Sequence, residues 1–72
     1  MYLYLPVKEQ LYHPDIGAYT SFGLAAFLAV RQLAFISDVS TDLALVQDLS
    51  QSCTDGQLEP IHLQDVILNS LT

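Results

Sequence analysis

A tight turn near the start of the chain separates two segments that favour β-structure. The turn is the HPDIG stretch at residues 13–17, in which Pro14 presets φ and Gly17 tolerates a positive φ. The segment before it, residues 2–12, is rich in Tyr, Leu and Val, and Pro6 within it indicates an edge strand or an irregular entry. These features together predict a β-hairpin at the start of the chain.

The segment after the turn, residues 18–30, fits both a strand and a helix. Apolar and small residues alternate along it, as in a strand, but its centre at residues 24–29 consists of good helix formers. We predict a strand, because a hairpin turn precedes it and Gly23 would weaken a helix. Residues 33–36 offer a third strand, and we place the turn before it near residues 28–31.

Two helices are predicted in the last third of the chain. Ser40 is the expected N-cap of the first, since its hydroxyl can accept from an unpaired amide, and Asp42 suits the first turn of a helix dipole. Gly56 suits the position just past the end of this helix, and Pro60 opens the second one. The apolar stripe of the first helix is Leu43, Leu45, Val46, Leu49 and Cys53. The buried side of the second is Ile61, Leu63, Val66, Ile67 and Leu71.

The order of these elements defines the expected fold class. A chain of 72 residues is short for one ordinary domain, so residues 1–72 are expected to form a single unit. The order β-β-β-α-α predicts an α+β fold, namely a three-stranded antiparallel β-meander followed by two helices packed on one face of the sheet.

Four stretches resemble a family of short uncharacterised bacterial proteins whose pattern runs YxxYGI, DIS, a helix and LxPxHLxDVVEDFL. They are residues 19–24, residues 36–42, Cys53 with Leu58, and residues 60–67. The resemblance spans nearly the whole chain, and it implies one compact, freestanding cytoplasmic domain with no assigned activity. The chain departs from the pattern at residues 68–70, where Leu-Asn-Ser replaces an acidic pair, which puts any acidic patch at that end in doubt.

The charge of the chain argues against nucleic acid as a partner. Eight acidic residues oppose only Lys8 and Arg31, giving a net charge of −6, whereas proteins that hold phosphate backbones are basic. Aromatic stacking of bases on Tyr12, Tyr19 and Phe22 would lack cations to anchor it. The longest uncharged apolar run, residues 22–30, is too short for a membrane span, and no targeting segment stands out, so we expect a soluble, cytoplasmic protein.

The residues that could carry catalysis form only a weak pattern. His62 and Asp65 are three positions apart on one predicted helix, and Cys53 would complete a nucleophile, base and orienting group by residue type. Cys53, however, continues an apolar stripe, and Asp38 is explained by its place at the entry to the first helix. His62, Asp65 and Asp38 therefore remain weak functional candidates, and we expect no catalytic residue.

Metal and cofactor sites are not expected either. The candidate ligands, His13, Asp15, Cys53, His62 and Asp65, do not stand at metal-ligand spacing, and one cysteine excludes a zinc ribbon or finger. Three separated glycines make no phosphate loop.

The favoured function is a noncatalytic module that binds a second copy or another protein. A chain this small gains about 105 kcal/mol from apolar burial and loses about 108 kcal/mol in conformational entropy, so a lone copy has no clear surplus. Two helices can cover only one face of a sheet, and the other face carries Phe27 with Ala25 and Ala29. We expect a dimer through this face or through the edge strand of residues 2–12, with Tyr2, Tyr4 and Phe27 as interface candidates.

Three other hypotheses stay open at this point. One is a small-ligand binder or enzyme at a dimer cleft, with His62 and Asp65 at its mouth. Another is an acidic inhibitor that occupies a basic surface, which requires the acids to cluster on one face. The last is a scaffold whose contacts are all internal.

Overall fold

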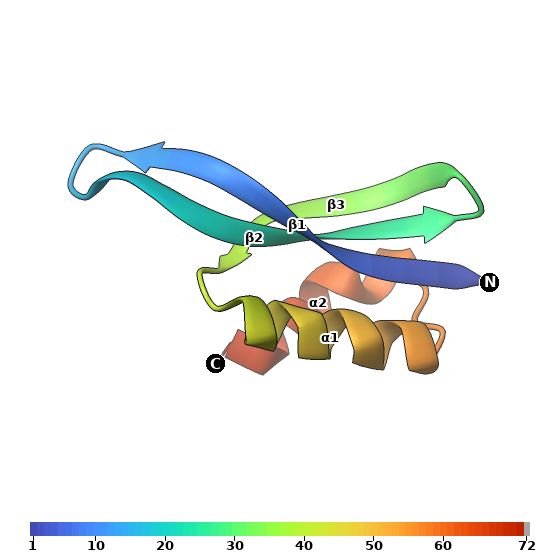
Figure 1. The fold of residues 1–72 in the computed structure, drawn as a ribbon. Coiled ribbons are helices and arrows are strands. Elements are labelled where there is room, and N and C mark those ends of the chain that lie inside the picture. Colours follow the sequence, from blue (N-terminus) through green and yellow to red (C-terminus); the bar gives the residue numbers. More distant parts are fainter. Residues whose placement is uncertain (72) are drawn as a thin grey trace.

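Three antiparallel strands followed by two α-helices make up the fold in the computed structural model, which describes residues 1–71 (Figure 1). In chain order the elements are β1 (Tyr2–His13), β2 (Gly17–Leu28), β3 (Arg31–Ser40), α1 (Leu43–Asp55), the 3₁₀ turn η1 (Pro60–His62) and α2 (Leu63–Leu71). The strands form a three-stranded sheet in the order β1-β2-β3. The predicted α+β class and the β-β-β-α-α order are confirmed.

The strands meet through the two turns that the sequence predicted. β1 and β2 pair without a break from Tyr2↔Leu28 to His13↔Gly17, and Gly17 has a φ of 78°. The second turn falls at Ala29 and Val30, inside the predicted window, and Ala29 takes a positive φ of 54° although it is not glycine. β3 is longer than the predicted residues 33–36, because an irregularity in its pairing with β2 lets it bend and continue to Ser40.

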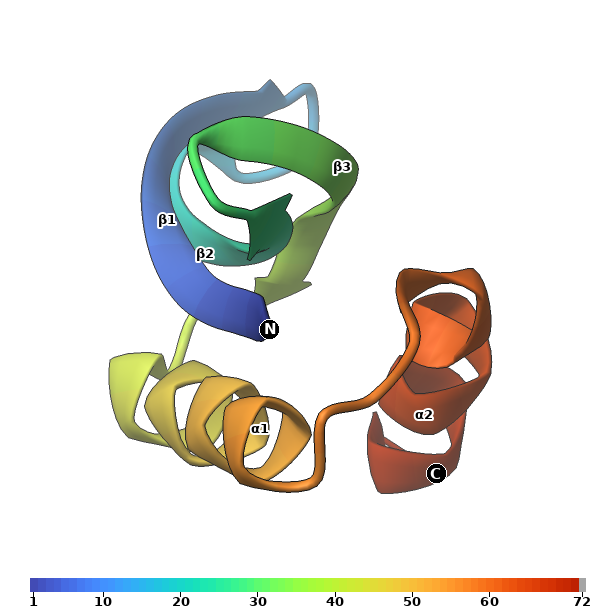
Figure 2. The same ribbon diagram turned by 90° about the vertical axis from the view of Figure 1, so that its right-hand side faces the viewer.

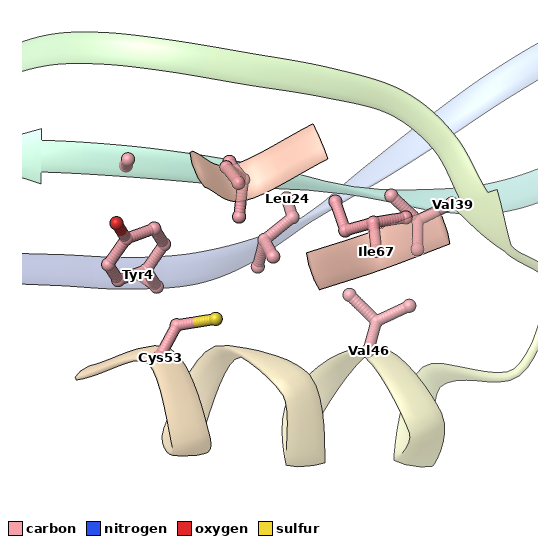
Figure 3. Packing of buried hydrophobic residues seen from close by; sticks show 8 residues of the cluster. Tyr4, Leu24, Val39, Val46, Cys53 and Ile67 are labelled. Atoms are coloured by element: carbon pink, nitrogen blue, oxygen red, sulfur yellow. The ribbon is translucent and has the colours of Figure 1, made fainter. Parts of the chain in front are cut away.

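Both helices lie on one side of the sheet, as Figure 2 shows, with α1 and α2 below the curled strands. α1 packs against all three strands and most closely against β1. In Figure 3, Val46 and Cys53 of α1 point toward the sheet, where they meet side chains such as Leu24 and Tyr4. The buried core consists of Tyr4, Leu24, Ala26, Val39, Val46, Cys53, Leu63 and Ile67.

The residue that caps α1 is Asp42, not Ser40. The Asp42 carboxylate accepts a hydrogen bond from the Ala44 amide at 3.0 Å. Ser40 pairs with Phe22 as the last residue of β3, and its hydroxyl accepts from the Asp42 amide at 3.0 Å. The prediction of Ser40 as N-cap was wrong because the strand runs further than its sequence pattern indicated.

The second helix starts with a tighter turn than predicted. Pro60 opens η1 as expected, and the α-helical part begins only at Leu63. Ile61, predicted to be buried, is 81% exposed because the 3₁₀ turn places it outside the apolar side of α2. The predicted burial of Leu71 concerns a side chain outside the described part of the chain. No helix within residues 1–71 is long and apolar enough to cross a membrane.

Candidate functional site: the sheet face opposite the helices

The sheet face that points away from the helices is mainly apolar. Side chains alternate between the two faces of a strand, so the neighbours of the core residues face outward. We define the open face as Leu3, Leu5 and Val7 of β1, Ala25 and Phe27 of β2, and Leu33 and Phe35 of β3. Leu3 and Leu5 are each 44% exposed, Leu33 is 40% exposed and Phe35 is 39% exposed. Four large apolar side chains on this face thus remain in contact with solvent.

At the centre of the open face, the small residues Gly23 and Ala25 of β2 lie beside the ring of Phe35. Ala25 is fully buried although no helix covers it. Beside it, a Cβ built on Gly23 would lie 2.7 Å from a Phe35 ring carbon and 2.6 Å from the Ile36 carbonyl oxygen. Only glycine therefore lets Phe35 and the β3 backbone come so close to β2.

Charged side chains lie outside the apolar part of the open face. Asp48, Asp55 and the capping Asp42 belong to α1 and its start, on the helical side of the sheet, and Asp15 lies in the turn between β1 and β2. Glu59 and Asp65 accompany the second helix. Glu9 and Asp38 lie only at one end of the face, beyond Val7 and Phe35 in their strands. The apolar part of the face carries no charge, which is typical of the centre of a protein interface.

A polar network occupies the end of the face where β3 bulges. Between the pairs Phe22↔Ser40 and Leu24↔Ile36, β2 contributes one residue and β3 contributes three. Asp38, within this bulge, has a positive φ of 54°. Its amide donates to the Glu9 carboxylate at 2.8 Å, so a side chain of β1 holds the bulge of β3 across the middle strand.

Hydrogen bonds to Asp38 change its acidity and that of a neighbouring tyrosine. The Ser21 hydroxyl donates to one carboxylate oxygen of Asp38, and the Tyr19 hydroxyl donates to the other at 2.8 Å. These two bonds, with that from Ser21 the larger cause, lower the pKa of Asp38 below its usual value. The same contact raises the pKa of Tyr19, because its hydroxyl would lose the bond on ionisation.

The structure changes the interpretation of Asp38. The sequence placed it at the entry of the first helix, but it belongs to the bulge of β3. Tyr19, Gly23 and Asp38, three of the residues on which the family resemblance rests, are brought together around this bulge. Glu9 was missed, since nothing local in the sequence shows that it reaches β3.

The weak catalytic candidates do not assemble into a site. His62 and Asp65 are both exposed, and no hydrogen bond or ion pair joins their side chains within residues 1–71. Cys53 is 5% exposed in the core, and burial raises the pKa of its thiol, which disfavours the reactive thiolate. A ligand cleft formed between two copies around His62 and Asp65 stays a prediction.

Two hollows lie on the helical side of the molecule. The larger, about 370 Å³, is lined by Leu45, Leu49, Asp48 and other residues of α1, and its far wall is Ser70, near the end of the described chain. The smaller, about 190 Å³, lies over Cys53 and Leu58. Neither is lined by His62 or Asp65. Within residues 1–71, no three His, Cys, Asp or Glu side chains come together as metal ligands.

The interface candidates fall in three different environments. Tyr4 is only 2% exposed, and its hydroxyl donates to the Leu58 carbonyl, so the structure removes it from the surface. Tyr2 is half-buried against the core, with its backbone bonded to Gln57. Phe27 is half-buried and lies on the open face, as predicted.

The geometry of the described residues thus singles out the open face as the candidate functional surface. Comparisons of the chain with protein-family models, with curated proteins and with solved structures find no match.

Proposed function

We propose that this protein is a noncatalytic self-association module, in which the sheet binds a second copy of the chain. The observation that carries the proposal is the open face, with four exposed or partly exposed large apolar side chains and no charge among them. Contiguous apolar surface of more than a few hundred Å² is uncommon on a monomer and is typical of an interaction site.

The arrangement of charge supports a second copy as the occupant. A protein with a net charge of −6 repels itself, but five of its eight acidic residues belong to the helical part of the chain, from Asp42 onward. When two copies meet through their sheets, these acids stay on the outer sides of the pair. Repulsion between exposed charges farther apart than about 8 Å is largely screened at physiological salt.

The cellular setting belongs to the same proposal. We place the module in the cytoplasm, where a free cysteine such as Cys53 stays reduced. The motifs at residues 19–24, 36–42 and 60–67 support its relation to the family of short bacterial proteins that they resemble.

Light scattering behind a sizing column tests the proposal. We expect a mass of twice the 8.0 kDa of one chain when the protein is loaded at about 10 to 200 µM, the range in which a modest dimer persists. A mass of one chain at every concentration would contradict self-association.

A matched pair of leucine variants places the interface. Leu33, 40% exposed, lies on the open face, whereas Leu28, 42% exposed, lies on the helix-facing side of β2 beyond the core. Leu33→Lys should give the mass of one chain, because it places a charge in an apolar interface. Leu28→Lys, with the same change in size and charge, should keep the mass of two. Equal masses for the two variants would exclude the open face as the interface.

A further inference from the structure

The outer edge of β1 is closed at its first two outward-facing positions. The Gln57 side chain accepts from the Tyr2 amide at 2.8 Å and donates to the Tyr2 carbonyl at 3.0 Å, as a neighbouring strand would. The Thr54 hydroxyl accepts from the Tyr4 amide at 3.0 Å. Another strand therefore cannot add to this part of the edge, which corrects the first half of the dimer edge predicted at residues 2–12.

Packing of face on face covers apolar surface that joining of edges would leave in water. In this chain both helices lie on one side of the sheet (Figure 2). Two copies joined by antiparallel pairing of one edge strand would form a single sheet, with both open faces uncovered and the acidic helices of both copies on the same side. Two open faces packed on each other cover the apolar side chains of both copies and leave the helices on the two outer sides.

The open face is divided along its strands into an apolar part and an acidic end. We call the side chains that lie next to one another across the three strands a row. Leu5, Ala25 and Phe35 form the middle row of the apolar part. Two rows further along β1 lies Glu9, whose carboxylate accepts from the Asp38 amide at 2.8 Å. The Asp38 carboxylate accepts from the residue opposite Glu9 on β2, so both acids lie in one row at one end of the face.

Two face-to-face packings are possible for a symmetric pair. Packed sheets keep their strand directions within about 30° of each other, so the two-fold axis between them runs nearly along the strands or nearly across them. With the axis along the strands, the strands of the two copies run parallel, and every row lies over the same row of the partner. Glu9 then lies over the partner's Asp38, because the axis exchanges the two edges of the sheet. With the axis across the strands, the strands run antiparallel and the order of the rows is reversed.

The acidic end disfavours the parallel packing. Any overlap of the apolar rows in that packing also sets the two acidic rows against each other, and like charges that face one another oppose an interface. In the antiparallel packing about the middle row, Leu3 lies over the partner's Val7, and Glu9 falls beyond the partner's Tyr2, where β1 begins. The apolar rows then cover one another, and the carboxylates stay in water.

We infer that, given the proposed self-association, the two open faces pack with their strands antiparallel, about a two-fold axis that crosses the row of Leu5, Ala25 and Phe35. Glu9 and Asp38 determine this orientation, because the apolar rows of two copies can overlap without opposed carboxylates only when the acidic ends point in opposite directions. A face whose charges lie at one end is complementary to itself in this orientation, which favours a second copy as its occupant.

The two turns of the sheet provide positions from which the orientation can be measured. Asp15 lies in the turn between β1 and β2, beyond the acidic row, and Val30 lies in the turn at the other end of the sheet (Figure 1). The Asp15 side chain is 87% exposed and Val30 is 100% exposed. Each is replaced by cysteine in a separate variant and labelled briefly with a donor or an acceptor dye, so that the buried Cys53 stays unmodified. Light scattering checks that each labelled protein keeps the mass of two chains.

Energy transfer in two mixtures of labelled copies distinguishes the packings. With a rise of about 3.3 Å per residue and about 10 Å between sheets, the antiparallel pair places Asp15 about 20 Å from the partner's Val30 and about 50 to 60 Å from the partner's Asp15. We therefore expect strong transfer from an Asp15 donor to a Val30 acceptor and weak transfer between two Asp15 labels. The parallel packing predicts the reverse order.

Neutral variants test whether the two acids determine the orientation. Glu9→Gln combined with Asp38→Asn removes both charges and keeps the size of both side chains. We expect energy transfer between two Asp15 labels to rise in this variant, since the parallel packing then brings no carboxylates together. Asp48→Asn combined with Asp55→Asn changes the net charge equally on α1 and should leave the transfer unchanged. Equal transfer in the two double variants would overturn the role of Glu9 and Asp38.

The outcomes separate this inference from the proposed function. A wild-type protein with the mass of one chain contradicts self-association itself. A wild-type dimer in which the two Asp15 labels exchange energy as strongly as Asp15 and Val30 do, or more strongly, leaves self-association standing and overturns the antiparallel packing.

Discussion

Asp42 satisfies one of the amides at the start of α1 that have no partner inside the helix, since its carboxylate bonds the Ala44 amide. We expect Asp42→Ala to lower the free energy of unfolding by about 1 kcal/mol, the usual cost of losing an N-cap. Asp48→Ala, in the middle of the same helix, is the control and should leave stability unchanged or slightly raised, because alanine is the better helix former. Urea denaturation measures both, and equal midpoints would contradict the cap assignment.

Asp38 makes the stability of the protein depend on acidity. Its ionised carboxylate accepts hydrogen bonds from Ser21 and Tyr19, which lower its pKa in the folded state. The stabilisation is therefore complete above the unfolded pKa of about 3.9 and is lost as the pH falls through the lower pKa of the folded state. We expect the unfolding free energy of the wild type to fall in this acid range.

The variant Asp38→Asn tests this dependence, because it cannot titrate. Its unfolding free energy should be lower than that of the wild type at pH 7, and the difference should shrink as the pH falls below about 4. Asp48→Asn, whose side chain accepts no hydrogen bond among the described residues, should keep the acid dependence of the wild type. A constant difference between Asp38→Asn and wild type from pH 3 to 7 would show that the Asp38 charge does not stabilise the fold.

At the scale of elements, the attachment of β1 to α1 depends on the side chains of Thr54 and Gln57, which hydrogen-bond the β1 backbone as a neighbouring strand would. Thr54→Val keeps the shape of the side chain but leaves the Tyr4 amide without an acceptor. We expect this change to lower the unfolding free energy by about 1 to 3 kcal/mol, the cost of an unpaired buried polar group. Thr41→Val, at an exposed position between β3 and α1, is the control and should cost little. If the two variants unfold at the same urea concentration, the Thr54 contact does not hold the edge.

The bent shape of β3 depends on residues in the two other strands of the sheet. Its bulge needs the Glu9 carboxylate on β1 and the missing Cβ of Gly23 on β2. The bulge also allows Ile36 and Val39, three positions apart, to face the same core, which a regular strand with a two-residue period cannot do. The irregular part of the sheet thus serves its packing on the helices.

At the scale of the whole molecule, Cys53 reports on the integrity of the core. It lies between α1 and the sheet, near Tyr4 (Figure 3), and is 5% exposed. A thiol-specific reagent should label it slowly in the native protein and stoichiometrically in denaturant, because burial both hides the thiol and raises its pKa. Asp48→Cys, on the exposed side of the same helix, should add one equivalent that reacts at once. Fast labelling of Cys53 in the native wild type would contradict the packing of α1 on the sheet.

The sequence by itself determined the element order and most of the faces. Turn chemistry at residues 13–17, alternation along β2 and the helical spacing of Val46, Leu49 and Cys53 are local signals, each readable within a few residues. The same alternation indicated that one sheet face would be apolar and uncovered, and it placed Phe27 there. Local periodicity suffices for these features because it sets which side of an element can be buried.

Tertiary structure decided where the elements end and which edges remain free. Asp42 replaces Ser40 as the cap because β3 continues through a bulge held by Glu9, 29 positions away from Asp38. The first half of the edge strand predicted at residues 2–12 is closed, because Gln57, 55 positions away from Tyr2, and Thr54, 50 positions away from Tyr4, bond its backbone. Contacts between residues so distant leave no local pattern. They exist only once the sheet has curled and α1 has packed against it, and for this reason the sequence indicated an apolar sheet face but not which part of the sheet edge is closed.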